Sequence, residues 1–84
     1  MAQSIRTAAE ARLLRDFGRR VLMLREQRGL SQMKLAHAAG LHATYIGQVE
    51  NGRRNVALLN VYALARALEV EVSDLMPPTT RSRR

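Results

Sequence analysis

The segment 30–55, LSQMKLAHAAGLHATYIGQVENGRRN, constrains the fold of this chain more than any other stretch. Its first helix is expected to begin at Ser31, whose hydroxyl can accept a hydrogen bond from the first turn, and to end before Gly40. Glycine readily adopts the positive φ of a tight turn, so a second short helix can follow at about 43–50. Asn-Gly then stops that helix, and a basic Arg-Arg-Asn loop, 53–55, follows it. We therefore expect two short helices joined by a glycine turn and closed by a basic loop.

Helical signals recur on the N-terminal side of this segment. Thr7 and Glu10 have the spacing of a capping box, in which each side chain can satisfy a backbone N–H at the start of a helix. Apolar residues then recur every three or four positions, which predicts a helix from about 7 to 28. Gly18 lies inside this pattern at a cost of about 1 kcal/mol relative to alanine. Either a neighbouring helix packs closely at Gly18, or the helix begins near Asp16.

Two further helices are expected after the basic loop, one over about 57–68 and a short one over 73–76 capped by Ser73. The inward stripe of the longer helix is expected to be Leu58, Val61, Ala65 and Leu68. The inward face of the helix that begins at Ser31 is expected to be Met33, Leu35, Ala36 and Ala39, with Met33 only partly covered. No strand signal and no internal repeat are seen, so the predicted fold is all-α with five helices.

The chain divides into three parts by this interpretation. A helical N-terminal extension covers 1–15, a helical domain covers 16–76, and a disordered basic tail covers 77–84. With 84 residues there is room for one domain with a modest core. Fourteen Lys and Arg against seven Asp and Glu give a net charge of +7, which favours a polyanion or an acidic membrane surface as partner. There is no cysteine and no apolar run long enough to span a membrane, so we expect a soluble protein of the cytoplasm.

A set of residues at fixed spacing carries a family resemblance. It combines helix caps, the turn glycine, core positions and the Glu-Asn-Gly-basic loop: Gly18, Val21, Leu24, Arg25, Gly29, Leu30, Ser31, Gln32, Leu35, Ala36, Gly40, Leu41, Tyr45, Ile46, Val49, Glu50, Asn51, Gly52, Arg53, Arg54, Asn55, Leu64, Ala65, Leu68 and Val70. Over about 16–76 the chain resembles the Cro/C1-type helix-turn-helix family of phage repressors and xenobiotic-response-element-like regulators. The resemblance implies a five-helix lambda-repressor-like domain in a bacterial transcription regulator that binds double-stranded DNA, nucleoid-associated when bound.

Within that family the chain is similar to the controller proteins of restriction-modification systems. This narrower resemblance depends on Thr44 and Tyr45, on the run 52–56, and on the absence of a second domain. It implies a small dimer that binds a palindromic operator. Controller proteins often have a basic residue where this chain has Ala43, so readout of guanine by a bidentate arginine at that position is not available here.

Base contacts are expected from the N-terminal end of the 43–50 helix and from the face opposite its core. The residues placed there are His42, Ala43, Thr44, Gly47 and Gln48. The amide of Gln48 can pair bidentately with adenine, which makes it the best reader of sequence. Thr44 can donate a hydroxyl or pack its methyl on thymine. His42 can contact DNA or act only as a helix cap.

Phosphate contacts are expected at the two ends of the helical pair. They comprise Gln32, Tyr45, Asn51, Arg53, Arg54 and Asn55. Gln32 matches the family glutamine at a helix N-terminus, where N–H groups favour an anion. Tyr45 can pack at the junction between the two helices, donate a hydrogen bond from its hydroxyl to a phosphate, or do both. A basic loop can also be an ordinary solvated surface.

The family resemblance pairs Glu50 with Arg25 in a structural ion pair that ties the 43–50 helix to the first helix. A carboxylate near DNA phosphates would otherwise repel them. A dimer interface is expected from apolar residues outside the main stripe: Leu59, Tyr62, Val72, Leu75 and Met76. The alternative is that these residues complete the core of the monomer.

Other functional classes fit the sequence less well. His37 and His42 are five residues apart, which is not the spacing of a two-histidine metal site on a helix, so no metal is expected. Ser31 has no plausible base oriented towards it and no glycine-rich phosphate loop is visible, so neither a cofactor nor enzymatic activity is expected. An antitoxin-like protein of the same fold is the second hypothesis, and a membrane-surface role is the third. RNA polymerase is a further candidate partner. The N-terminal extension could join the dimer or contact DNA through Arg6, Arg12 and Arg15, and the sequence does not choose between these.

Overall fold

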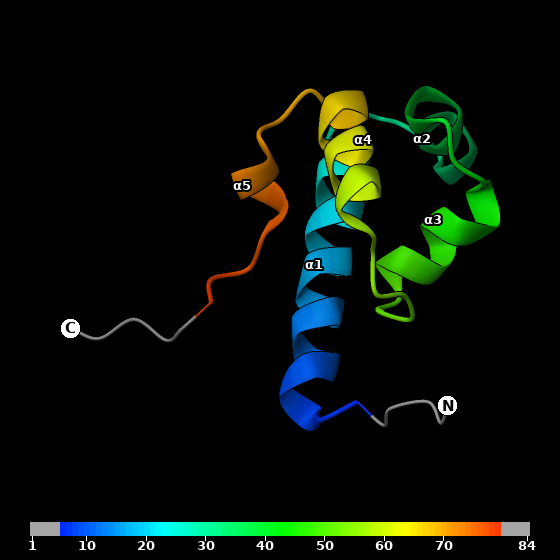
Figure 1. The fold of residues 1–84 in the computed structure, drawn as a ribbon. Helices are drawn as coiled ribbons and strands as arrows, with labels where there is room; N and C mark the ends of the chain where they lie inside the picture. The colour runs from blue at the N-terminus through cyan, green and yellow to red at the C-terminus, as the bar shows by residue number, and fades with distance from the viewer. Residues whose placement is uncertain (1–5, 80–84) are drawn as a thin grey trace.

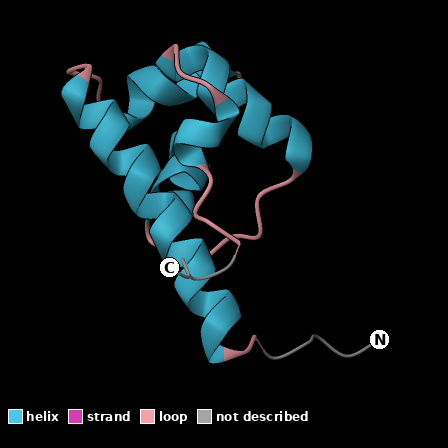
Figure 2. Cartoon of the chain, turned by 90° about the vertical axis from the view of Figure 1, so that its left-hand side faces the viewer, coloured by secondary structure: helices cyan, strands magenta, loops and turns pink. Residues whose placement is uncertain are grey.

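The structure, a computed structural model, describes residues 6–79. Five helices and no strand form within this range (Figure 1). They are α1 (Ala8–Gln27), α2 (Gln32–Ala39), α3 (Ala43–Glu50), α4 (Leu58–Leu68) and α5 (Val72–Leu75). The all-α, five-helix prediction is confirmed. Figures 1 and 2 both show the first turns of α1 extending beyond the other helices.

The long helix α1 begins at the predicted capping box. The Glu10 N–H donates to Thr7 Oγ1 and the Thr7 N–H donates to Glu10 Oε1, each at 3.0 Å. Residues 8–15 are therefore continuous with the rest of α1, and the alternative start near Asp16 is wrong. Residues 1–5 of the predicted extension lie outside the described residues.

Close packing explains Gly18. A Cβ at this position would clash with the Val49 carbonyl oxygen and would lie 2.8 Å from the Glu50 carbonyl oxygen. The backbone of α1 therefore touches the last turn of α3, and only glycine allows that approach. This bears out the first of the two explanations for Gly18.

The helical pair has the predicted caps and turn. Ser31 Oγ accepts from the Lys34 N–H at 3.0 Å, and Gly40 ends α2 with φ at 73°. The helix α3 covers the range predicted for it. His42 is its N-cap residue, but its side chain makes no capping hydrogen bond.

The core lies between α1, α2, α3 and α4 and is closed by α5. Its fully buried larger side chains are Val21, Leu35, Ile46, Val49, Leu64, Leu68 and Leu75. Met33 and Leu58, both predicted to face inward, are instead 73% and 69% exposed. Met33 lies about 200° of helix rotation from buried Leu35, and Leu58 lies about 60° to one side of Val61.

The helix α5 begins one residue earlier than predicted, and Ser73 is not its cap. The Glu71 N–H donates to Asp74 Oδ2 at 3.0 Å instead. This start turns Leu75 fully into the core, so its assignment to a dimer interface is wrong. Of the predicted tail, 80–84 lies outside the described residues, and Pro77 is partly buried.

Candidate nucleic-acid interface

The helix α3 is held by its inward face and presents the opposite face to solvent. Ile46 and Val49 are at most 1% exposed, whereas Thr44 on the other face is exposed. Of the remaining predicted base readers, His42 is exposed and Gly47 and Gln48 are half-buried. Ala43 packs partly against the core. Thr44 and Gln48 are therefore the polar side chains on the outward face of this helix.

Several predicted DNA-binding residues meet around one hollow at the N-terminal end of α3. Its lining consists of Leu41, His42, Thr44, Tyr45, Gln48, Arg54 and Asn60. Arg54 Nε donates to Gln48 Oε1 at 2.8 Å, and the Arg54 guanidinium lies 5.0 Å from the centroid of the Tyr45 ring. The guanidinium thus stacks on the aromatic ring while it holds the amide oxygen of the predicted base reader.

Asn60 is a member of this cluster that sequence reasoning missed. Its Nδ2 donates to the Tyr45 hydroxyl oxygen at 3.1 Å. The hydroxyl proton of Tyr45 remains available to donate to an acceptor outside the protein. Tyr45 also packs against the core, so the structural and the phosphate-binding interpretations of this residue are compatible. No local pattern marks Asn60, because its partner lies 15 residues earlier in the chain.

The Arg25–Glu50 ion pair is present and is bidentate. Arg25 Nε lies 2.6 Å from Glu50 Oε2, and Arg25 Nη2 donates to Glu50 Oε1 at 3.0 Å. The Glu50 side chain is 2% exposed and that of Arg25 is 12% exposed. The hydrogen bond to Glu50 raises the pKa of Arg25, and it outweighs the opposing effect of burial. Arg25 Nη1 also donates to the Leu30 carbonyl oxygen at 2.9 Å, so one guanidinium joins α1, α3 and the start of the helical pair.

Gln32, a predicted phosphate ligand, lies at the N-terminus of α2 and joins the same network. Its Nε2 donates to Glu50 Oε1 at 3.0 Å. The second N–H of that amide is not used by this bond. Its side chain also lies beside Gly47, at 3.6 Å from where a Cβ would stand.

The basic loop after α3 is exposed and is shaped by α1. Asn51, Arg53, Arg54 and Asn55 are all exposed. Gly52 has φ at 73°, and a Cβ there would lie 2.8 Å from Arg15 Cγ. The loop therefore rests directly on α1, a contact that the sequence did not reveal.

The residues predicted to form a dimer interface fall into two groups. Leu59, Tyr62 and Met76 are 80%, 50% and 45% exposed, and exposed Leu58 lies next to Leu59. Val72 is partly buried against the core, and Leu75 belongs to the core. The exposed face of α4 is thus apolar over its first turns, at Leu58, Leu59 and Tyr62, without the help of α5. No helix within residues 6–79 is long and apolar enough to cross a membrane.

Comparisons with known proteins agree with this geometry. The helix-turn-helix family model matches residues 21–75. The control protein C.BamHI of Bacillus amyloliquefaciens is 43% identical over 65 residues, which cover 76% of this chain and 80% of that protein. The crystal structure of the restriction-modification controller protein C.AhdI from Aeromonas hydrophila has a TM-score of 0.74 at 48% identity, covering 75% of this chain and 96% of that one. The hypothetical transcription factor NHTF from Neisseria has a TM-score of 0.76 at 32% identity and covers 93% of this chain and 90% of its own.

Proposed function

Because the chain belongs to the Cro/C1-type helix-turn-helix family of DNA-binding transcription regulators, we propose that it is the controller protein of a restriction-modification system. It acts as a homodimer on a palindromic operator. The observation that carries this proposal is α3, which presents exposed Thr44 and half-buried Gln48 opposite its buried face and is followed by a basic loop. The similarity to proteins named as controllers supports the choice within the family.

We assign sequence readout to the outward side of α3. Gln48 pairs with adenine once its amide oxygen is released by Arg54, and Thr44 packs on thymine or donates its hydroxyl. His42 contacts a base or phosphate at the helix start. The small residues Ala43 and Gly47 allow α3 to approach the groove closely. Ala43 is less accessible than the other residues proposed to contact bases, because it packs partly on the core.

Phosphates are bound on both sides of this reading surface. The ligands are Gln32, Tyr45, Asn51, Arg53, Arg54 and Asn55. Such contacts fix the register of the protein on the duplex without reading sequence. Glu50 does not add repulsion, because its charge is neutralised by Arg25 and held away from solvent.

The dimer forms through the exposed apolar face of α4 with Met76 and the accessible part of Val72. Leu59 and Tyr62 are its central residues. Two copies place their α3 helices in successive major grooves, about 34 Å apart. A protein this small gains specificity by doubling its contacts.

Selection of bound sequences from a random duplex library tests the proposed function. The expected result is a palindrome whose half-sites are separated by about one helical turn. Enrichment of a single unpaired half-site would refute the dimer, and no enrichment would refute sequence-specific binding. Endonuclease and methyltransferase genes beside the coding sequence are expected for a controller, whereas a small toxin gene in that place would favour an antitoxin.

We place this non-enzymatic protein in the bacterial cytoplasm, on the nucleoid when bound. RNA polymerase is its proposed partner where the operator lies just upstream of a promoter. A pull-down of RNA polymerase by the operator-bound dimer checks this contact, and recruitment equal to that by bare DNA would refute it.

A further inference from the structure

Three exposed arginines of α1 form one stripe. Arg12, Arg15 and Arg19 follow the i, i+3, i+7 spacing, which keeps them within about 60° of one another around the helix. Within the described part of the chain, the ion pairs are Arg25–Glu50 and Arg28–Glu69. The three residues, which we call the arginine stripe, are therefore not neutralised by a carboxylate of residues 6–79.

The arginine stripe adjoins the basic loop. A Cβ at Gly52 would lie 3.0 Å from the Cα of Arg15 and 3.1 Å from its backbone N. The backbone of α1 is thus in contact with the loop that carries Arg53 and Arg54. Figure 1 shows α1 passing beside this loop and continuing beyond it. The stripe consequently extends the positive surface of the loop along the first half of α1.

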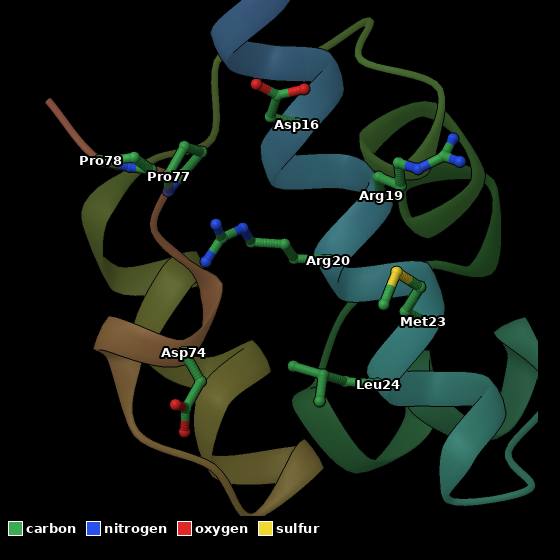
Figure 3. A pocket seen from close by; sticks show the side chains of 8 residues that line it. All are labelled: Asp16, Arg19, Arg20, Met23, Leu24, Asp74, Pro77 and Pro78. Carbon is green, nitrogen blue, oxygen red and sulfur yellow. The ribbon is translucent and has the colours of Figure 1, made fainter. Parts of the chain in front are cut away.

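The arginine that follows the stripe has a different environment. Figure 3 shows Arg20 pointing toward Pro77 and Asp74, whereas Arg19 points to the other side of α1. Arg20 Nη1 lies 3.4 Å from the Met76 carbonyl oxygen, so it belongs to the packing of the C-terminal segment. Asp16 is close to the stripe in sequence but makes no ion pair with it among residues 6–79.

We propose that the arginine stripe binds the phosphate backbone of the same duplex that α3 reads, next to the phosphates bound by the loop. This inference rests on the proposed DNA-binding function and enlarges its footprint. From Arg12 to Arg19 the helix axis advances about 10 Å. One DNA strand carries a phosphate about every 3.4 Å of axis, so the stripe matches two or three successive phosphates.

Electrostatics favours a DNA phosphate backbone, rather than a second copy of the chain, as the partner of the arginine stripe. Three arginines placed against their own copies across a two-fold axis would repel one another. A phosphate backbone offers the opposite charge at a similar spacing, and neutralising it releases counterions. The N-terminal half of α1 therefore supplies affinity that does not depend on sequence.

The test compares two double variants that each remove two charges from α1. Arg12→Gln with Arg19→Gln alters the stripe but leaves Arg15, which supports the loop. Arg20→Gln with Arg28→Gln is the matched control on other parts of the same helix. Affinity is measured from low to high salt, on the operator selected by the wild type and on an unrelated duplex of equal length. Melting temperature and sedimentation are measured for every variant.

We expect the stripe variant to bind both duplexes several-fold more weakly at low salt, with unchanged preference between them. The slope of log K against log salt should fall by about 1 to 2 units, since each phosphate contact contributes about 0.9. The control variant should match the wild type. The proposal is overturned if the slope of log K against log salt in the stripe variant equals that of the wild type. It is also overturned if the control variant loses as much DNA affinity as the stripe variant, or if sedimentation shows that the stripe variant alone no longer forms the dimer. These outcomes leave the proposed function intact, whereas a wild type that selects no duplex would refute both.

Discussion

Glu50 shows at the residue scale how a negative charge can lie close to the proposed DNA-binding surface without opposing it. Its carboxylate receives two hydrogen bonds from Arg25 and one from Gln32. The raised pKa of Arg25 means that its stabilising contribution to the fold is fully present near neutral pH. The contribution of Arg25 to the free energy of unfolding is lost only as the pH rises through the raised pKa of this residue. Arg25 therefore does not make the stability depend on pH near neutrality.

Glu50→Ala is expected to destabilise the fold by about 3 kcal/mol, because Arg25, whose side chain is only 12% exposed, loses its partner. The melting temperature should fall by about 10 °C or more in a domain of this size. Arg28→Ala breaks the Arg28–Glu69 pair, whose side chains are 41% and 70% exposed, and should leave stability nearly unchanged. Equal melting temperatures for the two variants would contradict the structural role of Glu50.

Gln48→Ala is expected to change which base is preferred at one position of each half-site. Arg54→Ala should instead weaken specific and non-specific binding alike and lower the salt slope by about 1. Because Arg54 Nε donates to Gln48 Oε1, the two effects should not be additive in the double variant. Binding competition among single-base operator variants measures this, and unchanged preference after Gln48→Ala would show that another residue reads the base.

The sequence predicts the ion pair and the outward face of α3 but not the cluster around Tyr45. Family spacing relates Arg25 to Glu50, and helix periodicity separates Thr44 and Gln48 from Ile46 and Val49. The contact of Asn60 with Tyr45 depends on how α4 lies against α3. Neither propensity nor periodicity contains that information.

At the scale of elements, local chemistry fixes the helix boundaries well. Thr7, Ser31 and Gly40 act within a single turn, so their capping roles can be inferred from the sequence. Leu58 is predicted wrongly because it lies about 60° to one side of the buried Val61. Met33 is predicted wrongly because it lies nearly opposite the buried Leu35 on α2. Leu75 is predicted wrongly because α5 has four residues, too few for periodicity to reveal its buried side.

The contact between α1 and α3 can be tested at two glycines that differ in their surroundings. Gly18→Ala should destabilise the fold by about 1 to 3 kcal/mol, because the new Cβ overlaps the backbone of α3. Gly47→Ala is the matched change inside α3, where the nearest atom to the new Cβ would be 3.6 Å away. It should be neutral or stabilising by up to about 1 kcal/mol, since alanine favours a helix. Chemical denaturation distinguishes the two, and equal stabilities would refute the close approach.

For the whole molecule, self-association should depend on the exposed face of α4. Leu59→Gln with Tyr62→Gln is expected to weaken dimerisation about tenfold or more, as loss of central apolar anchors does. Folding should be preserved because both side chains are at least half exposed. Met33→Gln changes an equally exposed apolar residue on α2 and should not affect the dimer. Sedimentation equilibrium measures the association constant, and a larger effect from Met33→Gln would move the interface away from α4.

The attachment of α3 has a consequence for how such regulators diversify. This helix is fastened by Ile46, Val49, Glu50 and the close contact of its last turn with Gly18. Exposed Thr44 takes no part in that attachment, and the side chain of half-buried Gln48 is hydrogen-bonded to exposed Arg54. Replacing these outward side chains would alter operator preference at little cost in stability. The same scaffold is therefore expected to tolerate different outward residues on α3 without loss of the fold.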